Sequence, residues 1–157
     1  MRLFPVRLIP VRLIPLLVLA LLVHEAQGQG QTGVGVQVGD ITGLSLKIGA
    51  TGRAYDFAAA WDFNAESVVV QAHVLLAQPV LSQAGTSRVR WYYGPGGFIR
   101  LNDRADSELG VGLSVNVGVS YRFAPQFEGF AQATPRLLLV PASDVDLGVA
   151  LGIRFYP

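Results

Sequence analysis

The stretch 108-ELGVGLSVNVGVSYRF-123 decides the fold class of this chain. Its odd positions, from Leu109 to Phe123, are all apolar, and its even positions are small or polar, three of them glycine. Side chains of a strand alternate between two faces, so the stretch would have one apolar face and one small, polar face. A helix would distribute the same valines around its whole surface and place the three glycines in its interior, which is unfavourable. The stretch therefore predicts a long β-strand whose two faces meet different surroundings.

The same alternation recurs between turn signals over most of the chain. Short links rich in Gly, Pro, Asn, Asp, Ser and Thr, and one longer polar link over 78–87, separate eight alternating segments. The predicted strands are 33–39, 43–51, 53–63, 66–77, 88–101, 108–123, 126–140 and 144–156. Short links favour antiparallel neighbours, so we expect a meander.

The first 28 residues have the composition of a secretory signal. Three arginines precede an apolar run over 16–23, and Ala26 and Gly28 are small residues of the kind that a signal peptidase inspects. The apolar run is too short for a spanning helix, which needs about 20 residues. We therefore predict a signal peptide over 1–28 that is removed from a barrel domain over 29–157.

The composition of residues 29–157 excludes several classes of protein. Nine basic and ten acidic residues are dispersed along it, so no basic patch points to nucleic acid as a partner. The chain has no cysteine, which excludes disulfides and a lipidated N-terminal cysteine. Charged residues make up 15% of the chain, against about 25% in an average soluble domain. We therefore expect something other than water to cover part of its surface.

Two architectures fit the alternation, and they differ in what the apolar face contacts. In a soluble barrel, such as a periplasmic lipid-binding β-barrel, the apolar face forms the core and long charged side chains cover the other face. In an outer-membrane barrel the apolar face contacts lipid, and small residues with balanced charges fill the interior. Lys47 is the single lysine of the sequence, and glycine, alanine and serine are frequent on the polar faces. This composition favours the membrane barrel, with the soluble barrel as the alternative.

Strand length and closure also favour the membrane barrel. A tilted strand crosses a bilayer with about 9 to 11 residues, so residues 29–157 suffice for eight strands and short turns. An open sheet edge in lipid would leave amides without partners, so the sheet must close. We therefore predict an all-β, eight-stranded, antiparallel up-and-down transmembrane β-barrel. Aromatic residues are expected at its two rims, with Tyr121, Phe123, Phe127, Phe155 and Tyr156 at one and Trp61 and Phe63 at the other.

Several segments resemble a known family. They are "GVGVQVGDITGLSLKIG", "AYDFAAAWDF", "WYYGPGGFIRL", "FEGFAQATPRLLLVP" and "DLGVALGIRFYP". From about Gly33 to Tyr156 the chain resembles a family of small, largely uncharacterised bacterial outer-membrane β-barrel proteins, similar in outline to the transmembrane domain of outer membrane protein A. Asp40 and Ile41 stand where the family has an acidic residue followed by proline, a departure that affects one turn. The resemblance implies the barrel fold and a membrane location, and no defined biochemical activity.

The last predicted strand resembles the sorting signal that outer-membrane assembly machinery reads. Leu151, Ile153 and Phe155 alternate toward an aromatic end that includes Tyr156. The expected partners are therefore outer-membrane lipid and, during biogenesis, the assembly machinery and periplasmic chaperones. We expect a monomer in the bacterial outer membrane.

The polar faces carry charges that would point into the barrel. The predicted luminal charge network comprises Lys47, Asp56, Asp62, Arg90, Arg100, Glu108, Arg122, Glu128, Arg136, Asp146 and Arg154. The interior of an eight-stranded barrel is only wide enough for side chains to fill, and buried ions persist when they are paired. We therefore predict a plugged lumen without an open pore, and a structural or surface-interaction role.

His73 is the strongest candidate for chemistry. A catalytic histidine needs a nucleophile and an orienting acid, and Ser45, Ser114, Ser120, Asp56 and Asp62 all share its face. A lipid-modifying barrel enzyme is thus a third hypothesis. No spacing singles out any of these residues, so we predict no enzyme, catalytic residue or cofactor. One histidine among dispersed carboxylates likewise predicts no metal site.

Two prolines interrupt the predicted strands. Pro95, within "GPGG" at 94–97, and Pro135 each remove a backbone donor from a ladder. We expect bulges or rim positions at both.

Overall fold

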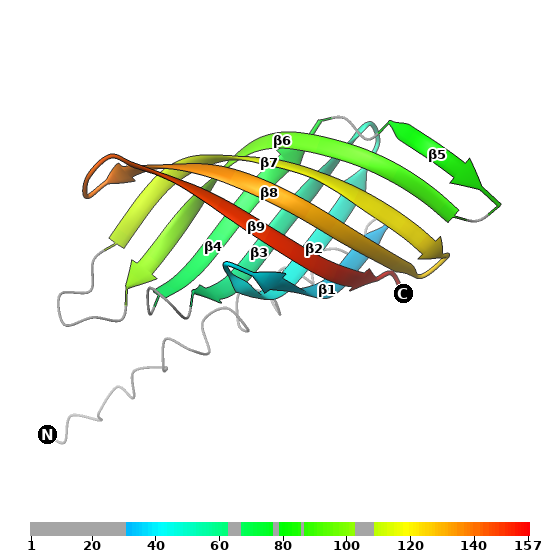
Figure 1. The fold of residues 1–157 in the computed structure, drawn as a ribbon, viewed down its shortest axis with the longest axis horizontal. Coiled ribbons are helices and arrows are strands. Elements are labelled where there is room, and N and C mark those ends of the chain that lie inside the picture. The colour runs from blue at the N-terminus through cyan, green and yellow to red at the C-terminus, as the bar shows by residue number, and fades with distance from the viewer. Residues whose placement is uncertain (1–30, 63–66, 77–78, 86, 103–108) are drawn as a thin grey trace, which may run out of the picture.

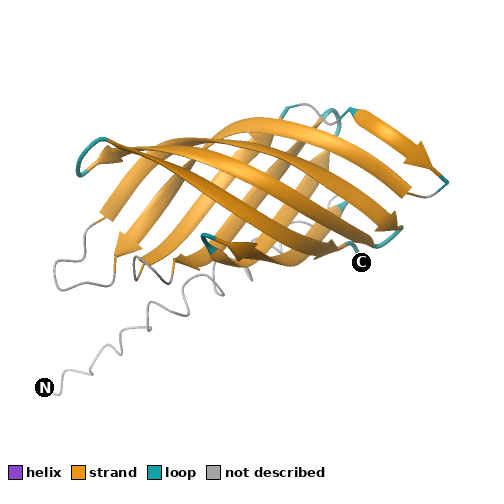
Figure 2. Cartoon of the chain, viewed as in Figure 1, coloured by secondary structure: helices purple, strands orange, loops and turns teal. Residues whose placement is uncertain are grey.

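The structure is a computed structural model that describes residues 31–62, 67–76, 79–85, 87–102 and 109–157. These residues form long antiparallel strands that wrap into a barrel (Figures 1 and 2). The strands are β1 (Thr32–Gly39), β2 (Thr42–Ala50), β3 (Arg53–Asp62), β4 (Ser67–Leu75), β5 (Val80–Ala84), β6 (Ser87–Asn102), β7 (Leu109–Ala124), β8 (Phe127–Val140) and β9 (Asp144–Phe155). The described part of the chain contains no helix with the length and apolar character needed to cross a membrane.

Eight of these strands close into a ring. The order is β4-β3-β2-β1-β9-β8-β7-β6, and β4 pairs with β6 to complete it. Every pairing is antiparallel, and β1 meets β9 from Val34 opposite Phe155 to Gly39 opposite Ala150. The predicted eight-stranded up-and-down barrel is therefore confirmed. We call the end at which β1 begins and β9 ends the terminal rim, and the other end the opposite rim.

Strand β5 lies outside the ring and was not predicted. The sequence of 78–87 suggests a polar link, whereas Val80–Ala84 pairs with the first residues of β6. Since β4 pairs with β6 only from Gly96 onward, the start of β6 has a free edge that β5 occupies. All five residues of β5 are exposed. A strand of five residues is too short for its alternation to stand out in the sequence.

The expected bulges at the two prolines are wrong. Pro95 lies in unbroken register opposite Val115 of β7, and the β4–β6 ladder ends one residue away, at Gly96. Pro135 pairs in register with Leu147 of β9, while the β7–β8 pairing omits Pro135 itself and Thr134. Each proline thus stands where a ladder on one side is interrupted, so its missing N–H removes no bond there. The register shifts of β8 and β7 lie elsewhere, near Val111 and Arg122.

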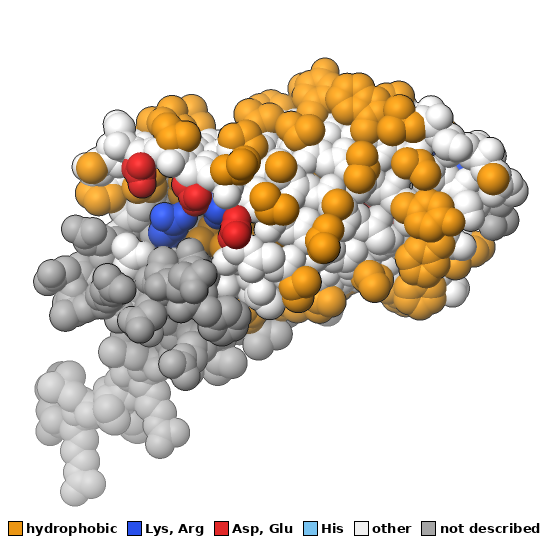
Figure 3. Space-filling view, viewed as in Figure 1, with side chains coloured by type: hydrophobic (Ala, Val, Ile, Leu, Met, Phe, Trp, Pro, Cys, Tyr) orange, Lys and Arg blue, Asp and Glu red, His pale blue; other side chains and the backbone are white. Residues whose placement is uncertain are grey.

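The apolar rows face outward. Along β7, Leu113 is 58% exposed while Ser114 and Asn116 beside it are buried, and Leu151 on β9 is likewise 58% exposed. Figure 3 shows hydrophobic side chains spread over the outside of the strands, with acidic and basic ones gathered near the opposite rim. Exterior exposure is clear on β1, where Val36 and Val38 are exposed, and on β6 to β9. On β2, in contrast, the outward-facing Leu46 is buried. The soluble barrel, which needs these rows inside, does not agree with this arrangement.

Interior glycines make room for large side chains on neighbouring strands. Gly118 lies opposite Tyr92 in the β6–β7 register, and a methyl group on Gly118 would lie 2.6 Å from that ring. Gly152 stands in the same relation to Phe130 on β8, at 2.3 Å. The mixture of glycine and aromatic residues on one face is therefore a packing requirement of a narrow barrel.

An aromatic belt surrounds part of the terminal rim. Its rings form a chain from Tyr121 through Phe123 and Phe127 to Phe155, with centroids 5.3 to 6.1 Å apart. Tyr156 does not join this belt, because the next residue after an outward Phe155 points inward, and it is only 7% exposed. Of the aromatics expected at the opposite rim, Trp61 is half-buried and Phe63 lies outside the described residues.

Candidate functional site in the barrel lumen

A central charge cluster is built around Arg154 of β9. Its guanidinium lies 2.5 Å from Asp56 Oδ1 and 3.4 Å from Glu128 Oε1, and its Nε donates to Ser45 Oγ at 2.9 Å. The ammonium of Lys47 lies 3.4 Å from Glu128. All five side chains are buried. Two cations and two carboxylates therefore balance each other in the lumen.

Strand register explains one of these contacts directly, that of Glu128 with Arg154. Lys47 of β2 lies directly opposite Asp56 of β3, and Glu128 of β8 lies directly opposite Arg154 of β9. Direct cross-strand neighbours on one face are close enough to interact. The contact between Arg154 and Asp56 instead crosses the lumen, from β9 to β3. A narrow ring permits that contact, whereas an open sheet would separate the two strands.

Neutral side chains extend the central cluster. Asn116 donates to Asp56 Oδ2 at 3.0 Å and to Gln132 Oε1 at 3.2 Å, and the Tyr92 hydroxyl donates to the same Gln132 oxygen at 3.2 Å. Our sequence reasoning did not select these three residues. Their only signal is their position on the polar face of a strand, which many residues share.

Tyr156 closes the cluster toward the terminal rim. Its hydroxyl donates to Glu128 Oε1 at 3.1 Å. Burial, reinforced by the negative charge of Glu128, raises the pKa of the Tyr156 hydroxyl far above its ordinary value. The hydroxyl therefore stays protonated and remains a donor. The ring also packs over Gly33, where a methyl group would lie 2.5 Å from it.

A second charge cluster lies toward the opposite rim. Asp146 accepts from Arg136 at 3.0 Å and from Arg100 at 3.4 Å. The side chain of Asp146 is 45% exposed, so this cluster is far more hydrated than the central one. The Arg100–Asp146 pair, in which both side chains are partly exposed, contributes little to stability.

The predicted network therefore divides into parts. Lys47, Asp56, Glu128 and Arg154 form the central cluster, and Arg100, Arg136 and Asp146 form the second one. Arg90 and Arg122 belong to neither and line the terminal rim. The side chain of Asp62 and all of Glu108 lie outside the described residues.

His73 has a serine partner. Its Nε2 lies 2.8 Å from Ser114 Oγ, which is the first requirement of a nucleophile and base pair. Asp56 lies opposite His73 in the β3–β4 register, yet the carboxylate contacts Arg154 and Asn116. His73 Nδ1 has no hydrogen-bond partner among the described residues. His73 is 2% exposed and Ser114 5% exposed, so the pair is shielded from solvent.

The described residues contain no group of three or more His, Cys, Asp or Glu side chains placed to hold a metal ion. What the central cluster provides is mutual neutralisation of two cations and two carboxylates, with hydrogen bonds from Ser45, Asn116 and Tyr156 around it. The arrangement thus brings buried charges from β2, β3, β8 and β9 together inside the ring.

Comparisons with known proteins agree with this fold. No protein-family model and no curated protein matches the chain. Among solved structures, a de novo designed transmembrane β-barrel matches with a TM-score of 0.59 and 15% identity, over 84% of this chain and 99% of the design. Neisserial surface protein A matches with a TM-score of 0.53 and 13% identity, over 82% of this chain and 94% of its own. At these identities the likeness shows the fold alone, which is that of an eight-stranded transmembrane β-barrel.

Proposed function

We propose that this chain is a small integral protein of a bacterial outer membrane, with a structural or surface-interaction role. On this proposal residues 1–28 are a signal peptide, and 29–157 form a monomeric barrel. The barrel has no enzymatic activity, and its lumen is plugged by the central charge cluster. The similarity in outline to the transmembrane domain of outer membrane protein A belongs to the same proposal.

One observation carries the membrane placement. The exterior of a closed barrel is lined with exposed valine and leucine, while ion pairs are buried in its interior. In water, such an exterior would be an apolar patch far larger than monomeric soluble proteins tolerate. In a bilayer, the same rows contact hydrocarbon, and the closed ladder leaves no unpaired amide in lipid.

The C-terminal strand supports an assembly role for its outer face. Leu151, Ile153 and Phe155 are exposed on the exterior of β9, where the assembly machinery could read them, while Tyr156 points into the lumen. We propose that the first three residues act as the sorting signal. Tyr156 instead contributes to the plug through Glu128.

Envelope fractionation tests the membrane placement. The full chain, expressed in a Gram-negative host, should be found in the outer-membrane fraction and should show heat-dependent migration in detergent gels. Brominated lipid should quench the fluorescence of Trp91, which is exposed on the exterior beside Tyr93. Recovery of the folded protein from the soluble periplasm would contradict the proposal.

A further inference from the structure

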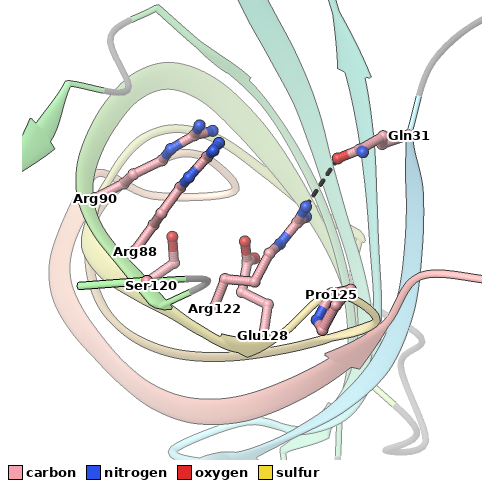
Figure 4. Close-up of a pocket in the computed structure, with 8 residues that line it drawn as sticks. Gln31, Arg88, Arg90, Ser120, Arg122, Pro125 and Glu128 are labelled. Carbon is pink, nitrogen blue, oxygen red and sulfur yellow. Dashed lines mark hydrogen bonds between the residues drawn. The ribbon is translucent and has the colours of Figure 1, made fainter. Parts of the chain in front are cut away.

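The terminal rim opens into two adjoining cavities of about 300 Å³ and 530 Å³. Both are lined by Gln31, Arg90, Arg122 and Glu128. Figure 4 shows Arg88, Arg90 and Arg122 pointing into the smaller cavity from neighbouring strands. We call this space the arginine vestibule. It lies between the plug and the barrel mouth.

Strand pairing forces the three arginines together. Arg88 lies directly opposite Arg122 in the β6–β7 register. Arg88 and Arg90 are two residues apart on one strand, so they share a face. Like charges placed directly opposite each other destabilise a sheet. Arg53 and Lys47 add positive charge to the larger cavity.

No carboxylate among the described residues forms an ion pair with these arginines. Glu128 is the one acidic residue that lines the two cavities, and it already contacts Lys47, Arg154 and Tyr156. The Arg122 guanidinium donates to Gln31 Oε1 at 2.9 Å and lies 4.2 Å from the Tyr156 ring centroid. The Nε of Arg90 is buried without a hydrogen-bond partner among the described residues.

This imbalance differs from the rest of the lumen. The central cluster matches two cations with two carboxylates, and at the second cluster Arg100 and Arg136 share Asp146. Each cation of these two clusters contacts a carboxylate, whereas Arg88, Arg90 and Arg122 of the vestibule have no ion-pair partner among the described residues. A mobile anion that enters from the open end would supply the missing charge.

We propose that the arginine vestibule binds a phosphate-bearing ligand. A guanidinium presents parallel N–H donors that match phosphate oxygens, and such charge-assisted hydrogen bonds are among the strongest in proteins. Arg88, Arg90 and Arg122 together suit a ligand with more than one phosphate charge. A cavity of about 300 Å³ admits a small molecule or a lipid headgroup.

The outer-membrane proposal adds an orientation to this site but is not required for it. Two of the three links at the terminal rim, 51–52 and 125–126, have two residues, which is typical of the periplasmic end of such barrels, and the third is the longer segment between β4 and β6 that contains β5. The ligand would then come from the periplasm or from the inner leaflet. Binding can be measured on the purified barrel, so failure of the site and failure of the membrane placement are distinguishable.

Calorimetric titration of inorganic pyrophosphate into the barrel in a neutral maltoside detergent tests the proposal. Wild type should bind one pyrophosphate per barrel, and Arg88→Gln/Arg90→Gln should lower the affinity at least about tenfold, the equivalent of one strong contact. Arg100→Gln is the matched control, because it removes an arginine from the same strand at the opposite rim and should leave the affinity unchanged.

Unfolding in urea provides a second readout. Pyrophosphate should raise the unfolding midpoint of wild type and of Arg100→Gln, and not that of the double variant. Without ligand, the double variant should be no less stable than wild type, since it loses like-charge repulsion. Equal affinity in wild type and the double variant, or no binding to either, would overturn the proposal.

The source of the phosphate is identified by measuring pyrophosphate affinity in nanodiscs. At about 0.15 M salt, charges farther apart than about 8 Å are screened. If pyrophosphate affinity falls when phosphatidylglycerol is added to phosphatidylcholine discs, lipid headgroups occupy the vestibule. If the affinity is the same in both kinds of disc, the ligand is a soluble phosphate compound. Either result supports phosphate recognition by Arg88 and Arg90.

Discussion

At the level of single residues, Arg154 has the greatest influence on the lumen. Its guanidinium bridges Asp56 on β3 and Glu128 on β8 and also donates to Ser45. Removal of one partner from a buried ion pair leaves an uncompensated charge, which costs far more than the pair itself contributes. The central cluster therefore depends on this side chain more than on any exposed charge.

We expect Arg154→Met to lower the free energy of unfolding by about 3–5 kcal/mol, because Asp56 loses its closest cation. Urea unfolding in phospholipid vesicles, followed by tryptophan fluorescence, measures the change. Arg100→Met is the control, since its pair with the half-exposed Asp146 should contribute about 1 kcal/mol or less. Equal losses in the two variants would contradict the central role of Arg154.

The interior glycines give a second prediction at this scale. Gly118→Ala should destabilise the barrel by about 1–3 kcal/mol, because the new methyl group would lie 2.6 Å from the Tyr92 ring and from the Ala131 carbonyl oxygen. Gly129→Ala should be nearly neutral, since the nearest atom there is 3.9 Å away. The same urea assay compares the two variants. A neutral Gly118→Ala would show that Tyr92 moves aside at no cost.

At the level of the strands, alternation carried most of the information in the sequence. Both ends of every ring strand were predicted to within two residues, because each strand alternates over eight residues or more. β5 and the prolines were missed for a different reason. Whether a short segment pairs, or a ladder has a gap, depends on how far neighbouring strands extend, which no local pattern encodes.

The outward face of β7 gives a prediction for the membrane. We expect Val117→Arg, in the middle of the strand, to cost about 2–4 kcal/mol in bilayers, because it places a charge in hydrocarbon. Val145→Arg, near the start of β9, should cost about 1 kcal/mol or less because it lies close to the opposite rim. Unfolding measured in vesicles distinguishes them. Equally small costs would place the exterior in water.

At the level of the whole molecule, closure decides which polar residues meet. The sequence identified the inward faces, and with them Lys47, Asp56, Glu128 and Arg154. It did not identify the contact of Arg154 with Asp56 across the lumen, or the pair of His73 with Ser114, since both depend on the curvature of the ring. Separation of the arginine vestibule from the plug likewise appears only in three dimensions.

The proposed plug predicts electrical behaviour. We expect the purified monomer in planar bilayers to show no steady ion conductance, because on our proposal the buried, paired side chains around Arg154 block the lumen. Arg154→Ala, which removes the bridging side chain, is the variant expected to conduct if any does. Steady currents through the wild-type monomer would contradict the closed lumen.

The seam between β1 and β9 joins the two ends of the chain. Besides the ladder, Asp40 fastens this seam, because its backbone N–H donates to the Val149 carbonyl and its carboxylate accepts from the Val149 N–H. Since both termini reach the same rim, a circular permutant that links 157 to 31 and opens at 51–52 keeps every strand pairing of the ring. It should refold in detergent with the native circular dichroism spectrum.

In cells the same permutant should fail to insert, because its final strand would be β2, and Phe155 would no longer stand near the C-terminus. Comparison of the outer-membrane yield with the refolding yield thus separates the stability of the ring from the sorting signal in the last strand. If the permutant inserts as well as the parent, the sorting signal lies elsewhere in the chain.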